Sequence, residues 1–210
     1  MPRSSVEVRT DDQGFARWTP AALAVAWAAL VAVAVVGRLW RPEWNGMRLW
    51  NVTPFVAVAL AAGSLFSHRL VAVAAPLGAL AIGNLALPGY ENPWMTAVVY
   101  AATAFPVLLG GLVRRGRWPA LLGGSLAGSL VFFLATNVAH WALTADYPRS
   151  AAGLVACLAA GLPFFRPIED LAWTGIVFGG LAVADRIGTA VATRDAVAAR
   201  ATAAAAGRLD

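Results

Sequence analysis

The chain has 210 residues, of which 60% are hydrophobic and 13% are charged, and its formal net charge is +5 at pH 7. This composition is typical of helical membrane proteins and excludes an ordinary soluble domain. All 16 basic residues are arginines, so chemistry that needs a lysine Schiff base, such as retinal or pyridoxal phosphate binding, is excluded. One cysteine, two histidines and three methionines supply few metal ligands, and we expect no metal and no other cofactor. The arginines are dispersed among short loops, which argues against nucleic-acid binding.

Residues 1–19 are polar, and the apolar run that follows is too long for the hydrophobic region of a signal peptide. We therefore interpret 1–19 as a tail and the run as a retained first helix. Six apolar segments predict membrane spans. They are residues 20–40, 51–66, 70–88, 95–113, 118–144 and, more weakly, 171–184. The pattern predicts an all-α integral membrane protein with about six transmembrane helices in a single domain, residues 20–186.

Between the last two spans, residues 150–162 form an apolar segment of 13 residues. As a helix it would cover about 20 Å, which is less than the roughly 30 Å of a bilayer core. We interpret it as a short partial or interfacial helix. Seven full spans remain the alternative, and that count would place the two ends of the chain on opposite sides. The alanine-rich residues 187–210 are interpreted as a second tail, without an assigned function.

The distribution of arginine predicts the orientation. With six spans and the N-terminus inside, 11 arginines fall in the inner segments and five in the outer ones. Short cytoplasmic loops are enriched in arginine, and the loop 114–117 alone carries three. We therefore predict a multi-pass protein of the cell membrane with both termini in the cytoplasm.

The second span begins with an irregular segment. Thr53 followed by Pro54 is typical of an N-cap with proline at the first helical position, so the helix should begin at Pro54. From there to Phe66 it would span about 20 Å. Residues 51–53 would then lie below the membrane surface, which is tolerated where the backbone lines a cavity. Asn92 and Pro93 predict the same kind of cap before the fourth span.

Polar side chains within the spans are distributed unevenly. Of 14 serine, threonine, asparagine, histidine and tyrosine residues, 11 lie in outer halves. Because polar groups in hydrocarbon need partners or a wet cavity, this asymmetry favours a pocket that opens outward. The alternative is 11 groups that are satisfied separately. The inner Ser125 and Ser129 form a small-residue row with Gly124 and Gly128, which we interpret as helix packing. Glu169 and Asp170 are interpreted as first-turn carboxylates at a helix dipole.

One face of the fifth span combines Asn137, His140, Trp141 and Thr144 at helical spacing, and this face suits a polar organic ligand. Catalysis is not indicated. Ser125 and His140 lie about 22 Å apart on one helix and cannot act as nucleophile and base. Metal-protease and nucleotide-binding motifs are absent from the sequence, so we expect neither an enzyme nor an ATPase.

Several motifs carry a resemblance to a known group. They are Asn-Val-Thr-Pro-Phe (51–55), Gly-Asn-Leu-Ala-Leu-Pro-Gly-Tyr (83–90), Phe-Phe-Leu-Ala-Thr-Asn (132–137) with Trp141, Tyr-Pro (147–148) and Gly-Leu-Pro-Phe-Phe (161–165). Over roughly residues 38–185 the chain resembles an uncharacterised bacterial family of transport proteins. That family is similar to the substrate-binding S components of energy-coupling-factor transporters.

The resemblance implies an S-component-like bundle in the bacterial inner membrane, which takes a vitamin-like or other small solute from outside. It also implies a transmembrane coupling subunit and two cytoplasmic ATPases as partners, with the lipid bilayer as surroundings. The alternative function is a membrane scaffold or assembly protein that does not transport. The candidate ligand-binding residues are Asn51, Thr53, Asn84, Tyr90, Asn137, His140 and Trp141.

Overall fold

The structure, a computed structural model, describes residues 18–40, 43–44, 47–48, 52–87, 89–115 and 118–206. These residues form seven α-helices, one 3-10 helix and an antiparallel pair of two-residue strands. In chain order the elements are α1 (Pro20–Leu39), β1 (Glu43–Trp44), β2 (Met47–Arg48), α2 (Phe55–Leu65), α3 (Arg69–Ala86), α4 (Pro93–Arg115), α5 (Trp118–Leu143), α6 (Ala151–Gly161), η1 (Leu162–Phe164) and α7 (Pro167–Ala206). The predicted all-helical class is confirmed.

Five helices, α1, α3, α4, α5 and α7, are long and apolar enough to cross a membrane. The segment expected to be a partial helix is α6, with 11 residues. The second predicted span is shorter than expected, because α2 also has 11 residues and covers about 16 Å. The predicted N-cap of this helix is wrong by one residue. Pro54 caps α2 without a side-chain hydrogen bond, and Thr53 precedes it.

The short helix α2 forms the centre of the bundle. Every residue of α2 except Gly63 is buried, as expected for a helix that is apolar on all sides. It packs against α1, α3, α4, α5 and α7. The crossing with α4 is closest at Gly63 and Gly110, where a Cβ built on Gly110 would lie 2.2 Å from the carbonyl carbon of Gly63. The small residues predicted on α5 also contact the centre, since a Cβ on Gly128 would lie 2.9 Å from Val56 Cγ1.

Local capping explains where several helices begin. The Thr19 hydroxyl accepts a hydrogen bond from the backbone N–H of Ala22 at 3.1 Å, just before Pro20 starts α1. The predicted cap at Asn92 is confirmed, because its Oδ1 accepts from the N–H of Trp94 at 2.9 Å. Ser150 caps α6 in the same way through the N–H of Gly153 at 3.2 Å.

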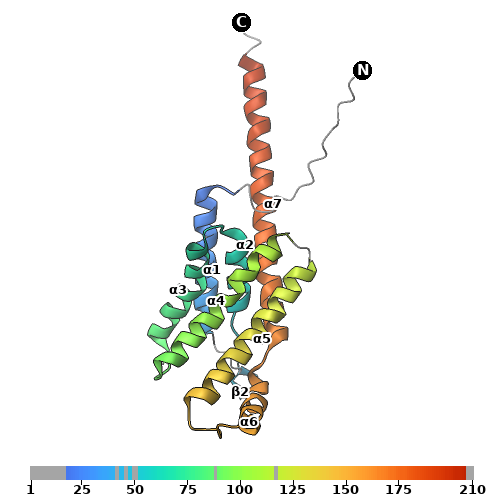
Figure 1. Ribbon diagram of the computed structural model, residues 1–210. Coiled ribbons are helices and arrows are strands. Elements are labelled where there is room, and N and C mark those ends of the chain that lie inside the picture. The colour runs from blue at the N-terminus through green and yellow to red at the C-terminus, as the bar shows by residue number, and fades with distance from the viewer. Residues whose placement is uncertain are drawn as a thin grey trace, which may run out of the picture.

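The bundle has two distinct ends (Figure 1). The first residues of α1 and the last residues of α7 lie at one end, which we call the terminus end. The α3–α4 connection, α6 and the first turn of α7 lie at the opposite end, which we call the loop end. The α7 helix continues through residue 187 to Ala206 without a break and extends well past the rest of the bundle at the terminus end.

Candidate functional site

A cavity of about 120 Å³ lies near the loop end and is lined by residues from α1, α2, α3, α4, α5 and α7 and from the connections before α2, α4 and α7. It combines charged, polar and aromatic side chains. The charged ones are Arg38, Arg166 and Asp170, and the polar ones are Thr53, Tyr90, Thr103, Ser129, Thr136 and Asn137. The rings are those of Phe55, Phe132, Phe133, Phe164 and Phe165, and Val56, Leu80 and Val99 complete the lining.

Arg38 reaches the cavity from the last turn of α1 across the surface of α3. Its Nη2 donates to Asn84 Oδ1 at 2.6 Å, and Asn84 Nδ2 donates to the Tyr100 hydroxyl at 3.3 Å. Gly83 makes this path possible, because a Cβ at that position would lie 2.5 Å from Arg38 Cδ. The guanidinium carbon lies 6.0 Å from the centre of the Phe55 ring. Asn84 and Tyr100 therefore fix the direction of the arginine side chain.

Asp170, in the first turn of α7, brings a carboxylate to the same cavity. It accepts a hydrogen bond of 2.5 Å from Ser129 Oγ on α5. One turn further toward the terminus end, the hydroxyls of Ser125 and Thr174 lie 3.0 Å apart, and both residues are buried. The seam between α5 and α7 thus carries a row of hydroxyl groups that begins at the Asp170 carboxylate.

Arg166 supplies a second cation at the rim, just before α7 begins. Its Nη1 donates to Glu169 Oε1 at 2.7 Å. Its Nε is shielded from solvent and makes no hydrogen bond within the described residues. A buried donor of this kind is uncommon in folded proteins and indicates an acceptor outside the described residues, such as a bound molecule.

The polar residues between these charges already use hydrogen-bond donors within their own helices. Thr103 donates to the carbonyl of Val99, Thr136 to that of Phe132, and the Asn137 amide to that of Phe133, each at 2.8 Å. Ser129 donates to Asp170. These side chains therefore offer mainly oxygen acceptors to a molecule in the cavity, whereas the two arginines offer donors.

The seven sequence-predicted residues fall into four groups. Thr53, Tyr90 and Asn137 line the cavity. Asn84 lies behind it and holds Arg38. Asn51 lies outside the described residues. His140 and Trp141 are not among the residues that line the cavity.

His140 and Trp141 instead hold the connection between α5 and α6. His140 Nε2 lies 3.0 Å from Asp146 Oδ2, and Trp141 Nε1 donates to the carbonyl of Pro148 at 2.9 Å. The Arg149 guanidinium lies 5.7 Å from the Trp141 ring. Asn137 is separated from them because α6 packs on α5 at this point, where a Cβ on Gly161 would lie 2.2 Å from Asn137 Oδ1. On the face of α5 that carries these residues, Asn137 therefore lies at the cavity, whereas His140 and Trp141 lie at the connection between α5 and α6.

Among the charged and polar residues that line the cavity, sequence reasoning gave no binding role to Arg38, Arg166, Asp170 and Ser129. Arg38 had a usable signal, since an arginine inside an apolar span is a functional candidate by default. Ser129, interpreted as a packing residue, is buried and in addition donates to Asp170. That contact depends on how α5 packs against α7, which the spacing within α5 does not reveal.

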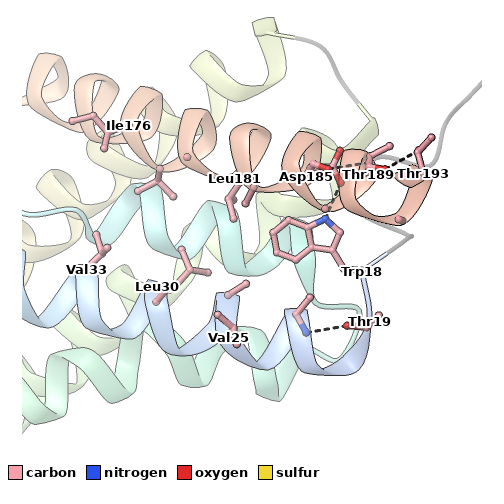
Figure 2. Close-up of a pocket in the computed structure, with 18 of the residues that line it drawn as sticks. Trp18, Thr19, Val25, Leu30, Val33, Ile176, Leu181, Asp185, Thr189 and Thr193 are labelled. Carbon is pink, nitrogen blue, oxygen red and sulfur yellow. Dashed lines mark hydrogen bonds between the residues drawn. The ribbon is translucent and has the colours of Figure 1, made fainter. Parts of the chain in front are cut away.

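A second hollow lies between α1 and α7 and has a volume of about 1070 Å³. We call it the α1–α7 groove. Figure 2 shows Val25, Leu30 and Val33 of α1 facing Ile176 and Leu181 of α7 across it. Both helices pack against α2. The Trp18 indole spans the gap at the terminus end and donates to Asp185 Oδ1 at 2.8 Å. Small residues, including Ala22, Ala29, Gly180 and Gly188, line much of the groove.

Within the described residues, no group of three or more histidine, cysteine, aspartate or glutamate side chains is placed to hold a metal ion. Comparison of the chain with curated proteins and with solved structures found no match. Residues 19–192 match a family described as "Family of unknown function (DUF6580)", and the chain therefore belongs to this family.

Proposed function

We propose that the protein is a multi-pass membrane protein that captures a small polar organic solute in the cavity at its loop end. The observation that carries this proposal is that Arg38, Arg166 and Asp170 line one cavity together with aromatic rings, in a bundle whose buried residues are mostly apolar. Charged groups at membrane depth are costly, and they persist where they serve a pathway or a binding site. Five helices of sufficient length and apolarity support the membrane location.

The cavity is closed toward the terminus end, which favours binding over free passage. Between the cavity and the terminus end, Leu60, Val113 and Leu121 pack together with Val56, which itself lines the cavity. The buried Ser64 on α2 donates to the carbonyl of Ala61 in its own helix. A channel would need a polar path from the cavity to the terminus end, whereas a capture site needs a cavity that is closed on that side. We therefore propose a pocket that receives its solute from the loop end.

The orientation that we propose places the loop end outside the cell and both termini in the cytoplasm. The arginine distribution supports it, because α4, whose last residues include Arg114 and Arg115, ends toward the terminus end, and cytoplasmic helix ends and loops are enriched in arginine. The cavity would then open to the compartment from which a solute is taken up.

A capture protein needs an energy source for uptake, and the sequence has no nucleotide-binding motif. We propose that it works as an S-component-like subunit with a transmembrane coupling protein and cytoplasmic ATPases. The α1–α7 groove is the surface that we assign to a transmembrane helix of the coupling protein. Its small residues allow close helix approach, and its polar residues, such as Thr189 and Arg200, gather toward the terminus end, where the ATPases would lie.

Solute capture is tested by measuring the unfolding temperature of the full chain in detergent against a library of small polar solutes, together with mass spectrometry of molecules that co-purify. At least one solute should raise the unfolding temperature saturably, because a ligand that binds only the folded state stabilises it. Asp170→Asn should abolish that shift, and Asp195→Asn, an exposed site on the same helix, should retain it. The scaffold alternative predicts that no solute gives a saturable shift.

Partner docking is tested by co-purification from the native host. Gly180→Leu should remove a coupling protein and its ATPases from the purified material, because the new side chain enters the groove. Gly179→Leu is the matched control, since this neighbouring residue does not line the groove and a Cβ there meets no atom within 4 Å. If Gly180→Leu removes only lipid or a second copy of the chain from the purified material, the assigned partner is contradicted. Solute uptake by the chain alone in sealed vesicles would contradict the need for one.

A further inference from the structure

We infer that the cavity is built for a small zwitterion with an apolar body, of the kind represented by the neutral α-amino acids. This inference rests on the proposed capture function and names the chemical class of its solute. Two observations support it. The lining residues leave particular hydrogen-bond donors and acceptors unused, and aromatic rings line the rest of the same cavity.

The donor side of the cavity is formed by guanidinium groups. Arg166 lines the cavity, and its solvent-shielded Nε has no acceptor within the described residues. The pairing with Glu169 uses Nη1, so the Nε edge of the guanidinium is available for an acceptor. Arg38 adds a second positive charge, held in place by Asn84. A planar guanidinium pairs with a carboxylate or a phosphate through two parallel N–H···O bonds, and the carboxylate is the smaller of the two. In a cavity of about 120 Å³ we therefore assign a carboxylate to the ligand.

The acceptor side is formed by Asp170 and by hydroxyl oxygens. Asp170 accepts one hydrogen bond, from Ser129, and a carboxylate has room for several. Thr103 and Thr136 have used their hydroxyl protons on their own helix carbonyls, and Asn137 has used an amide proton in the same way. What these oxygen atoms need from a ligand is hydrogen-bond donors. An ammonium group provides three of them together with a charge opposite to that of Asp170.

The apolar residues that line the cavity determine the size and character of the uncharged part of the ligand. Phe55, Phe132, Phe133 and Phe165 contribute rings to the same cavity, and Phe133 and Phe165 lie against each other with their centres 5.0 Å apart. The volume of about 120 Å³ is roughly ten times the 10 to 15 Å³ that one water needs by the same measure. A molecule of about ten non-hydrogen atoms fits this space, which agrees with an amino acid that has a branched aliphatic or aromatic side chain.

The test compares three probes that share one carbon skeleton and differ in their charged groups. L-Leucine carries both groups, 4-methylpentanoate lacks the ammonium and 3-methylbutylamine lacks the carboxylate. Calorimetry on the full chain in detergent or nanodiscs should show that leucine binds, and that each partial analogue binds about 10- to 150-fold more weakly, as expected from the loss of one hydrogen-bonded charged group. L-Phenylalanine with 3-phenylpropanoate and 2-phenylethylamine repeats the comparison for an aromatic body.

Two variants assign the charges to residues. Asp170→Asn should reduce leucine affinity to about that of 4-methylpentanoate and leave the affinity for 4-methylpentanoate itself unchanged. Arg166→Gln should do the converse, with 3-methylbutylamine as the unaffected probe. Ser129→Ala preserves the Asp170 carboxylate and provides a milder variant if Asp170→Asn does not fold. Asp195→Asn and Arg194→Gln, both exposed on α7, are the matched charge controls and should bind leucine as the wild type does.

The outcomes separate the two proposals. Equal affinity for the zwitterion and either partial analogue overturns the zwitterion assignment. Saturable binding of an uncharged solute or an inorganic anion, without any response to the amino acids, also overturns it but leaves solute capture intact. Absence of saturable binding for every probe and for the solute library overturns both.

Discussion

Asn84 is the residue on which the position of Arg38 depends. It accepts from the arginine at 2.6 Å and donates to Tyr100 at 3.3 Å, so one amide joins α1, α3 and α4. Asn84→Ala should lower the free energy of unfolding by about 1 to 3 kcal/mol, because it removes the hydrogen bond that Asn84 Oδ1 accepts from the charged Arg38 side chain. Thermal unfolding in a single detergent measures the effect.

Two further substitutions sharpen this prediction. Asn84→Asp preserves the acceptor and adds a negative charge beside Arg38, so its unfolding temperature should be at least that of the wild type. Tyr100→Phe removes only the longer hydrogen bond and should cost less than Asn84→Ala. If Asn84→Ala and Asn84→Asp unfold at the same temperature, Asn84 does not hold Arg38.

At the scale of elements, the contact between α2 and α4 determines how tightly the bundle closes. Gly110 lies against the backbone of Gly63, whereas a Cβ on the neighbouring Gly111 would meet no atom within 4 Å. Gly110→Ala should therefore destabilise the protein by about 1 to 3 kcal/mol or more, since the two helices must move apart. Gly111→Ala should be neutral or stabilise by up to about 1 kcal/mol, because alanine favours the helix.

Gly110→Ala and Gly111→Ala place the same side chain at adjacent positions of α4. The difference between their unfolding temperatures therefore measures the effect of the close contact between α2 and α4. Similar unfolding temperatures for the two variants would show that α2 and α4 do not approach each other as closely as the structure describes.

At the scale of the whole molecule, the arrangement in Figure 1 predicts which positions share a side of the membrane. The buried Cys157 is replaced by serine, and single cysteines are introduced at exposed positions. Glu91→Cys and Asp146→Cys, at the loop end, should react with a membrane-impermeant reagent in intact cells. His68→Cys and Ala201→Cys, at the terminus end, should react only after permeabilisation.

The His68 position also tests the short helix. With 11 residues, α2 covers about 16 Å, yet the chain must return to the terminus end before α3 begins at Arg69. Labelling of His68→Cys from outside would mean that α2 does not carry the chain across. Labelling of Ala201→Cys from outside would contradict the proposed orientation of α7.

Much of the helical framework was predictable from local sequence. Apolar runs of sufficient length predicted α1, α3, α4 and α5, whereas for α7 they predicted only residues 171–184 of the 40-residue helix. The caps at Asn92 and Ser150 lie next to the helices they start. These features depend on residues within a few positions of each other. The expected cap at Thr53 is displaced by one residue, because Pro54 takes the N-cap position of α2 and makes no side-chain hydrogen bond there.

The cavity could be predicted only in part. An uneven distribution of polar residues pointed to one end of the bundle, and Thr53, Tyr90 and Asn137 line the cavity there. His140 has the helical spacing to join Asn137, yet it pairs with Asp146 because α6 occupies the space between. Spacing along a helix determines which side chains share a face. It does not determine which neighbour covers each part of that face.

By itself, the sequence determined that the chain is helical and apolar, where most helices begin, and that polar groups gather toward one end. Only the tertiary structure decided that Arg38 meets Asn84, 46 residues away, and that Ser129 meets Asp170, 41 residues away. Helix formation and capping depend on neighbours in the chain, so composition and spacing reveal them. The contacts that build the cavity depend on close helix crossings, such as Gly83 against Arg38 and Gly63 against Gly110, which arise only when all the helices pack together.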